Sequence, residues 1–186
     1  EKQYLEELQL KFPGFYLVPE GGSNYLGMIG CQEILSEIEV SPDIIVLAAG
    51  TSTTAAGICL SLDEMQRLWV VPVLKSYSAT ENIRAILSRT AFESDMIEEY
   101  LERVISLEEY HFGGYAKCDS ALLDLIEESY FKYDLPLDPI YTGKAFYGLM
   151  NEVKKQDVKD TTILFIHTGG LQGAKKIFQK EKRAIY

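Results

Sequence analysis

Four consecutive hydroxyl side chains occupy residues 51–54, between an apolar run and a row of small residues. The run "PDIIVLAAG" predicts a buried strand, and a helix is predicted to follow from about Ser52. The start of a helix leaves backbone N–H groups unpaired and carries a partial positive charge, so it can bind an anion. Hydroxyl groups add donors, and glycine permits a tight turn. The stretch therefore predicts a phosphate site made by Gly50, Thr51, Ser52, Thr53 and Thr54.

Two familiar nucleotide motifs are missing from this stretch. No GK[ST] is present, which argues against a P-loop, and no GxGxxG is present, which argues against a dinucleotide fold. The residues also permit a simpler interpretation, in which the turn is an ordinary strand-to-helix connection and its hydroxyls cap the helix.

Three other segments carry glycines or tyrosines next to expected strands and helices. They are "VPEGGSN", "DPIYTGKAFYG" and "HTGG". Ligands bind outside the carboxyl ends of parallel strands, and these segments are expected at that edge of the sheet together with residues 49–54. A tyrosine such as Tyr141 can serve as an acid or base when a neighbouring positive charge lowers its pKa. Packing would explain any one tyrosine, because the chain has 12 of them, so the expected convergence is what favours a site.

The elements that must position these segments alternate along the chain. Helices are predicted near residues 2–11, 23–37, 52–66, 79–105 (in two pieces), 119–133, 143–154 and 171–182. Strands are predicted near residues 15–18, 44–48, 69–73, 107–111 and 162–167. Because the strands alternate with helices and are apolar on both sides, they predict an α/β fold with a mainly parallel sheet and helices on both faces. Pro72 places its strand at an edge or places the proline at a strand end. Residues 1–186 are expected to form a single domain.

Composition excludes several classes of function. Lys and Arg total 18 against 28 Asp and Glu, a formal charge of -10, so no basic excess is available for nucleic acid. Apolar runs are far shorter than the ~20 residues of a membrane helix. The three cysteines lack metal or CxxC spacing and are expected to be small buried side chains in a reducing, cytoplasmic compartment. The two histidines lie too far apart to suggest a metal site.

Four segments together resemble a known family. "FYLVPEGGSNYLGMIGCQEI", "AAGTSTTAAG", "DPIYTGKAFYGLM" and "ILFIHTGG" occur in the order and spacing of the 1-aminocyclopropane-1-carboxylate deaminase/D-cysteine desulfhydrase family. That family consists of pyridoxal 5'-phosphate enzymes with the tryptophan synthase β-like fold. The resemblance extends from about Phe15 to Gly170.

The resemblance implies roles for particular residues. The turn at residues 50–54 matches the loop that holds the cofactor phosphate. Tyr141 matches an active-site tyrosine near the substrate and the cofactor ring, and Tyr115 looks like a second one. Thr168 matches the residue that faces the pyridine nitrogen in the desulfhydrase branch. The deaminase branch has Glu directly after the tyrosine, where this chain has Thr142, and this difference favours desulfhydrase-like chemistry.

The family's lysine that binds the cofactor covalently lies far upstream, in a "GNK"-type motif, and none of the lysines here matches it. Lys144, within "YTGK", is expected to be a surface residue at a helix start. The resemblance therefore implies the C-terminal, cofactor-cradling part of a longer enzyme that acts on a small amino acid. Its partner would be the missing N-terminal part, and a homodimer is expected.

Two alternatives stay open at this point. One is a non-catalytic α/β module that binds a phosphorylated small molecule. The other is an inert folding unit that self-associates through exposed apolar surface, because large apolar patches are rarely left to water.

Overall fold

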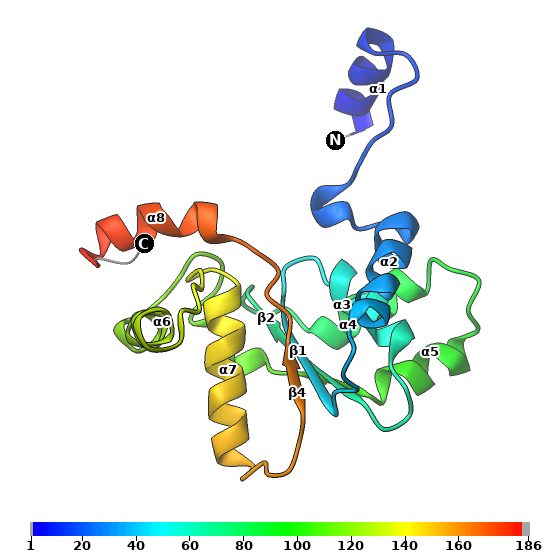
Figure 1. Ribbon diagram of the computed structural model, residues 1–186. Coiled ribbons are helices and arrows are strands. Elements are labelled where there is room, and N and C mark those ends of the chain that lie inside the picture. The colour runs from blue at the N-terminus through cyan, green and yellow to red at the C-terminus, as the bar shows by residue number, and fades with distance from the viewer. Residues whose placement is uncertain (1, 184–186) are drawn as a thin grey trace.

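The computed structural model describes residues 2–183 and contains one parallel sheet (Figure 1). In this part of the chain the strands are β1 (Ile44–Ala49), β2 (Arg67–Pro72), β3 (Val104–Ser106) and β4 (Ile163–Phe165). Their order is β3-β2-β1-β4, and every neighbouring pair is parallel. The predicted α/β class with a parallel sheet is confirmed.

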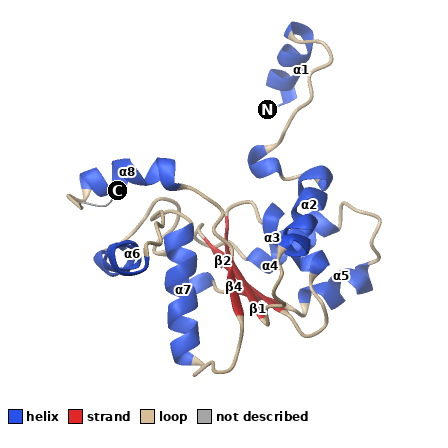
Figure 2. Ribbon diagram, viewed as in Figure 1, coloured by secondary structure: helices blue, strands red, loops and turns tan. Residues whose placement is uncertain are grey.

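Helices cover both faces of the sheet (Figures 1 and 2). On one face lie α2 (Tyr25–Gln32), α3 (Thr53–Ser61), α4 (Ala79–Leu87) and α5 (Ser94–Leu101). The other face is covered by α7 (Thr142–Lys155), with α6 (Ser120–Tyr133) and α8 (Leu171–Lys180) packed beyond it. The remaining elements are α1 (Lys2–Lys11) and three short 3-10 helices, η1 (Glu20–Gly22), η2 (Glu33–Glu37) and η3 (Glu108–His111). Within residues 2–183 no helix is long and apolar enough to span a bilayer.

The continuous apolar run of β1 is explained by burial on both sides. Successive side chains of a strand point to opposite faces. Ile45 and Leu47 pack in the core with α2–α5, while Ile44 and Val46 pack in the core with α7. The sheet therefore separates two apolar cores, and β1 lies between β2 and β4.

The predicted strand at residues 15–18 is wrong. This segment has no paired strand, and Tyr16 and Val18 are each 66% exposed. The residue types favour an extended chain, but a strand also needs a neighbour that accepts its backbone hydrogen bonds. Residues 2–18 instead form an arm that leads to α2 and projects away from the rest of the molecule (Figure 1).

The strand predicted at residues 107–111 is also wrong. The ladder lies earlier, at β3, inside the predicted second helical piece, and Leu107 adds one last bond from its N–H to the Val70 carbonyl at 2.8 Å. The chain then turns into η3, and Tyr110 packs in the core between the sheet and α7. Its hydroxyl donates to Glu152 at 2.7 Å. Pro72 is the last residue of β2, which is an interior strand. Of the two predicted alternatives, the proline at a strand end is therefore confirmed and the edge strand is not.

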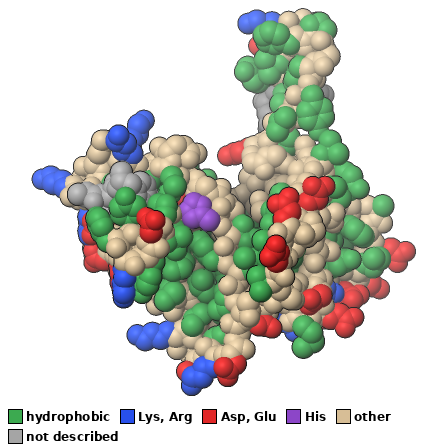
Figure 3. All heavy atoms as spheres, in the orientation of Figure 1, with side chains coloured by type: hydrophobic (Ala, Val, Ile, Leu, Met, Phe, Trp, Pro, Cys, Tyr) green, Lys and Arg blue, Asp and Glu red, His purple; other side chains and the backbone are tan. Residues whose placement is uncertain are grey.

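Apolar side chains are exposed along the arm. Figure 3 shows hydrophobic side chains over the projecting part of the molecule, and the residues are Tyr4, Leu10, Phe12, Tyr16, Leu17 and Val18. Tyr25 and Leu26 of α2 continue this exposure toward the sheet.

Glycine at the crossing of α2 and α3 lets helix α3 approach closely. A Cβ at Gly57 would lie 2.5 Å from the Met28 carbonyl oxygen and 2.5 Å from the Cys31 Cβ. No other residue type fits without moving a backbone, and this packing fixes the helix that begins at the hydroxyl turn.

We therefore expect Gly57→Ala to destabilise the protein, measured by urea unfolding. Overpacking costs about 1–3 kcal/mol, which exceeds the gain of up to ~1 kcal/mol that alanine gives over glycine inside a helix. Gly30→Ala is the matched control, because nothing lies within 4 Å of a Cβ there and the helix gain should appear alone. Equal stability changes in the two variants would contradict the packing argument.

Candidate active site

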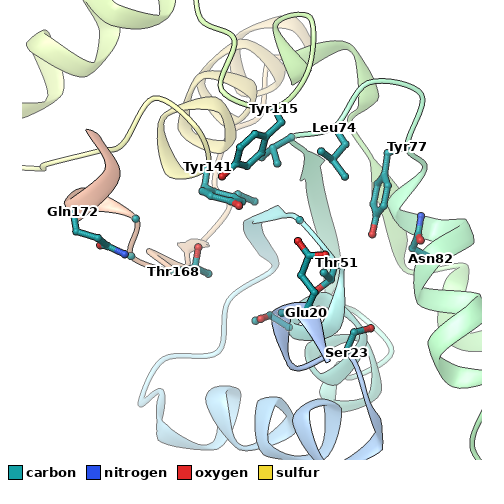
Figure 4. Close-up of a pocket in the computed structure, with 17 residues that line it drawn as sticks. Glu20, Ser23, Thr51, Leu74, Tyr77, Asn82, Tyr115, Tyr141, Thr168 and Gln172 are labelled. Carbon is teal, nitrogen blue, oxygen red and sulfur yellow. The ribbon is translucent and has the colours of Figure 1, made fainter. Parts of the chain in front are cut away.

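A cavity of about 680 Å³ lies at the carboxyl ends of β1, β2 and β4. The four segments singled out in the sequence all contribute to it (Figure 4). Its lining consists of Glu20, Gly21, Ser23, Ala48, Gly50, Thr51, Thr54, Val73, Leu74, Tyr77, Asn82, Tyr115, Tyr141, Thr168, Gly169, Gly170 and Gln172. The position is the one where parallel α/β sheets bind ligands, and the volume suits a small molecule.

The hydroxyl turn joins β1 to α3 at the floor of this cavity. Ser52 adopts a left-handed backbone conformation, with φ 64°, and α3 begins at Thr53. The first helical hydrogen bond runs from the N–H of Ala56 to the carbonyl of Ser52 at 2.9 Å. The earlier N–H groups of the helix have no acceptor inside the helix and can donate to an anion.

The predicted turn residues divide into two groups. Gly50, Thr51 and Thr54 line the cavity, whereas Ser52 and Thr53 are buried and do not. The Ser52 hydroxyl accepts a hydrogen bond from the Tyr77 hydroxyl at 3.2 Å. The Thr51 and Thr53 hydroxyls lie 3.1 Å apart, so the Thr53 side chain supports the turn from beneath.

Two tyrosine rings lie together at the opposite side of the cavity (Figure 4). The Tyr115 and Tyr141 ring centroids are 6.1 Å apart at an interplanar angle of 73°. The Tyr141 ring also lies close to the turn, because a Cβ at Gly50 would be 3.4 Å from its Cε1 atom. A side chain at position 50 would therefore be in van der Waals contact with the Tyr141 ring.

Tyr141 holds its proton at neutral pH. Burial, together with a hydrogen bond that the Tyr141 hydroxyl donates to the neighbouring Tyr115 hydroxyl, raises the pKa of Tyr141 to about 12. The carboxylates of Asp138 and Glu20 act in the same direction. The hydroxyl is therefore a hydrogen-bond and proton donor in this environment.

Asp138 fixes Tyr141 at the start of α7. Its fully buried carboxylate accepts from the backbone N–H groups of Ile140, Tyr141 and Thr142, each at 2.8 Å, and from the Thr142 hydroxyl at 2.8 Å. Such a carboxylate satisfies the unpaired N–H groups of the helix start and favours its dipole. A Cβ at Gly170 would lie 2.7 Å from Asp138 Oδ2, so the same carboxylate also packs against the "HTGG" segment.

The contacts of Asp138 explain the position of Thr142. This residue is fully buried, and its hydroxyl both donates to the carboxylate of Asp138 and accepts from the Asp138 backbone N–H at 2.9 Å. Thr142 does not line the cavity, whereas Thr168 does.

The expectation that Lys144 is a surface residue is wrong. Its side chain is fully buried, and its ammonium donates to the carbonyl oxygens of His111 at 2.9 Å and Gly114 at 2.7 Å. Burial lowers the pKa of Lys144 to about 8. The long, flexible side chain reaches a loop some thirty residues earlier in the chain, which local sequence patterns do not reveal.

Several residues that line the cavity escaped prediction. Leu74 and Tyr77 follow β2 at its carboxyl end, and Asn82 lies one turn into α4. The signal that could have found them is their place after a parallel strand, because ligands bind beyond the carboxyl end of β2 as they do beyond β1 and β4. Glu20 and Gln172 also line the cavity; Glu20 lies within the segment "VPEGGSN", and Gln172 lies two residues after "HTGG". In the described part of the chain, no group of three or more Asp, Glu, His or Cys is placed to hold a metal ion.

A family model described as pyridoxal-phosphate dependent enzyme matches residues 1–169. The chain belongs to this family. Its cofactor is accordingly pyridoxal phosphate, as the resemblance implied.

Individual relatives agree with this assignment. The chain is 31% identical over 180 residues to a protein of Pyrococcus horikoshii and 33% identical over 184 residues to one of Pyrococcus abyssi, both named "Putative 1-aminocyclopropane-1-carboxylate deaminase". Each match covers 92% of this chain and 54% of the relative, so the chain spans about half the length of the curated relatives it matches. A solved structure titled "Crystal Structure Analysis of the ACC deaminase homologue" matches with a TM-score of 0.77 at 29% identity, over 97% of this chain and 56% of that one.

The cavity of this pyridoxal-phosphate family member fits the cofactor's chemistry. The cofactor phosphate needs several donors, and the start of α3 and the Thr51 and Thr54 hydroxyls offer such donors at the cavity. The flat ring needs space as well, and the cavity of about 680 Å³, which Tyr141 also lines, has enough for it. Thr168 supplies a neutral hydroxyl at a third side of the cavity (Figure 4).

We expect Asp138→Ala to destabilise the protein strongly. It leaves three backbone N–H groups and one hydroxyl without their acceptor, and each buried unsatisfied group costs about 1–3 kcal/mol. The loss in unfolding free energy, measured by urea denaturation, should therefore exceed roughly 3 kcal/mol.

The matched control is Asp119→Ala. Asp119 is an exposed N-cap whose side chain accepts from the Leu122 N–H at 2.9 Å, and water can replace it at a cost of about 1 kcal/mol. A similar loss in both variants would mean that Asp138 is only a helix cap.

Proposed function

We propose that this chain is the cofactor-cradling part of a pyridoxal-phosphate enzyme that deaminates a small amino acid or eliminates a group from it. Its substrate would be of the 1-aminocyclopropane-1-carboxylate or D-cysteine type, and the reaction that of a deaminase, desulfhydrase or related lyase. Pyridoxal phosphate, when bound, supplies the electron sink for bonds broken at the α-carbon of the amino acid.

One observation carries the proposal: the hydroxyl turn and the tyrosine pair face each other across one cavity. Gly50, Thr51 and Thr54 line one side of it, and Tyr115 and Tyr141 line the other. A phosphate anchor and a pair of proton-holding groups therefore stand within reach of one small molecule. The Tyr141 hydroxyl, whose pKa is raised to about 12, would donate a proton, and the neighbouring Tyr115 hydroxyl would orient it.

The hydroxyl of Thr168 bears on the kind of reaction. A neutral hydroxyl would not enforce protonation of the pyridine nitrogen as a carboxylate would, because no opposite charge stabilises the cation. Thr142 stands where the deaminase branch has its glutamate, and its hydroxyl is hydrogen-bonded to the Asp138 carboxylate. Both features favour desulfhydrase-like elimination over opening of a cyclopropane ring.

Two features support a role for a further part of the enzyme. In residues 2–183 no lysine lines the cavity, although this class of enzyme needs one to hold the cofactor covalently. The arm exposes a row of apolar side chains, and exposed apolar patches mark surfaces that pack against other protein. We infer that a preceding part of the longer enzyme supplies the lysine and covers the arm, and that this chain alone is inactive.

Binding of pyridoxine 5'-phosphate tests the phosphate site. This compound carries an alcohol in place of the aldehyde and cannot react with surface lysines. In calorimetric titrations we expect it to bind more tightly than pyridoxine. The double variant Thr51→Val, Thr54→Val should weaken binding by at least about tenfold, because each hydrogen bond to a charged group contributes about 1.5–3 kcal/mol.

Thr162→Val is the control, because Thr162 is exposed next to the other end of β4 and its loss should leave binding unchanged. Equal affinity for pyridoxine and its phosphate would contradict the proposed site. Equal competition by inorganic phosphate would instead favour a non-catalytic phosphate-binding module.

Removal of the Tyr141 hydroxyl tests the chemistry. We expect the chain to gain activity only when co-expressed with the preceding part of the parent enzyme. In that assembly Tyr141→Phe should reduce turnover by about 100- to 10,000-fold, the usual loss when a proton-transfer group is removed. Binding of pyridoxine 5'-phosphate should persist, because the phosphate turn is untouched. Tyr133→Phe, at an exposed site on α6, should retain turnover, and near-normal turnover in Tyr141→Phe would make Tyr141 a packing residue.

A further inference from the structure

Lys144 is buried beside a loop that leads to the cavity. Its ammonium donates to the carbonyls of His111 and Gly114 at 2.9 and 2.7 Å. The Gly114 carbonyl belongs to the peptide unit that joins Gly114 to Tyr115. The lysine therefore holds the backbone at the point from which the Tyr115 side chain departs.

The loop at residues 111–117 needs such support. Phe112 and Ala116 both have positive φ, 55° and 53°, a conformation that costs free energy in residues with a side chain. Two of its backbone bonds are internal: Gly114 N–H to His111 and Lys117 N–H to Gly114, at 3.0 and 3.1 Å. Bonds within a loop do not fix its place relative to the rest of the protein.

The loop also makes aromatic contacts with α7, the helix that carries Lys144. The Phe112 and Tyr147 rings pack edge to face with centroids 4.9 Å apart. This contact lies at the beginning of the loop, whereas Lys144 holds the peptide unit directly before Tyr115, whose ring packs against Tyr141. Gly114 itself is buried. If the ammonium were removed, no water could take its place, and the Gly114 carbonyl would lose this hydrogen bond.

A lysine is a costly way to fill a buried space. A charged side chain is rarely fully buried unless its hydrogen bonds compensate for lost water. An apolar side chain of similar length would fill the volume without that cost, but it could not bind two carbonyls. The donor groups of Lys144, and not its volume, therefore distinguish it at this position.

The same helix start also holds the second tyrosine. The Tyr141 N–H donates to Asp138 at 2.8 Å, and Lys144 lies in the next turn of that segment. Both rings are thus placed by groups at the beginning of α7.

We propose that Lys144 is a positioning residue that fixes Tyr115 against Tyr141, so that the two hydroxyls face the cavity together. The inference deepens the proposed function and rests on it for its catalytic meaning. The placement of Tyr115 against Tyr141 by Lys144 does not depend on the proposed function, because it concerns only this chain without cofactor or substrate.

Hydrogen exchange of the protein, measured in the absence of ligand, tests this placement. In Lys144→Met we expect amides of residues 111–117 to exchange at least about tenfold faster than in the wild type, because a buried tie worth about 1–3 kcal/mol is lost. Amides of β1 and α6 should keep their protection. A nuclear Overhauser contact between the Tyr115 and Tyr141 rings should be present in the wild type and lost in the variant.

Ile97→Ala is the matched control. It removes a buried side chain of α5 in the core on the other face of the sheet, so exchange should accelerate across the protein and the ring contact should persist. The proposal would be overturned if Lys144→Met accelerated exchange everywhere to the same degree, or if it left the exchange rates of residues 111–117 unchanged.

The wild-type protein supplies a second measurement in case Lys144→Met does not fold. Residues 111–117 should exchange more slowly than an unstructured peptide, and the two rings should be in contact. An unprotected loop in the wild type would refute the proposal without any variant. Failure of pyridoxine 5'-phosphate to bind would refute the proposed function but would leave these results unaffected.

Discussion

The buried carboxylate of Asp138 is the constraint on which the candidate site depends. It gathers three backbone N–H groups and a hydroxyl at the start of α7, and it lies against Gly170. One anion therefore orders the segment that carries Tyr141 and the glycine segment that follows Thr168. The cost of burying the carboxylate is offset by its hydrogen bonds to the surrounding donors. The same hydrogen bonds hold those donors in place. Lys144, one turn later, extends the same ordering to the loop before Tyr115.

The site also shows how an acidic protein can hold an anion. The chain carries a formal charge of -10, and no lysine or arginine lines the cavity within the described residues. In the proposed site the attraction would come from short-range donors, the open N–H groups of α3 and the hydroxyls of Thr51 and Thr54. Exposed charges beyond about 10 Å are screened by salt, whereas donors that touch the ligand are not. Under the proposal, local geometry therefore outweighs the overall charge.

Sequence patterns predicted the elements whose signal is local. The strand at β1 was evident because a central parallel strand is apolar at every position, and the turn after it was evident because its hydroxyl residues are contiguous. The segment at residues 15–18 has the same strand-favouring composition, but no pattern reveals that it lacks a neighbour. The burial of Lys144 was equally hidden, because its acceptors lie about thirty residues away in a loop of irregular conformation. Glycine-rich motifs identified which segments meet, whereas the hydrogen bonds that align them follow only from the tertiary fold.

The position of a bound phosphate tests the central claim most directly. A crystal structure of the protein with pyridoxine 5'-phosphate should place the phosphate group against the N–H groups at the start of α3, with the ring extending toward Tyr141. A phosphate bound elsewhere, with the hydroxyl turn engaged only in its own capping, would contradict the account.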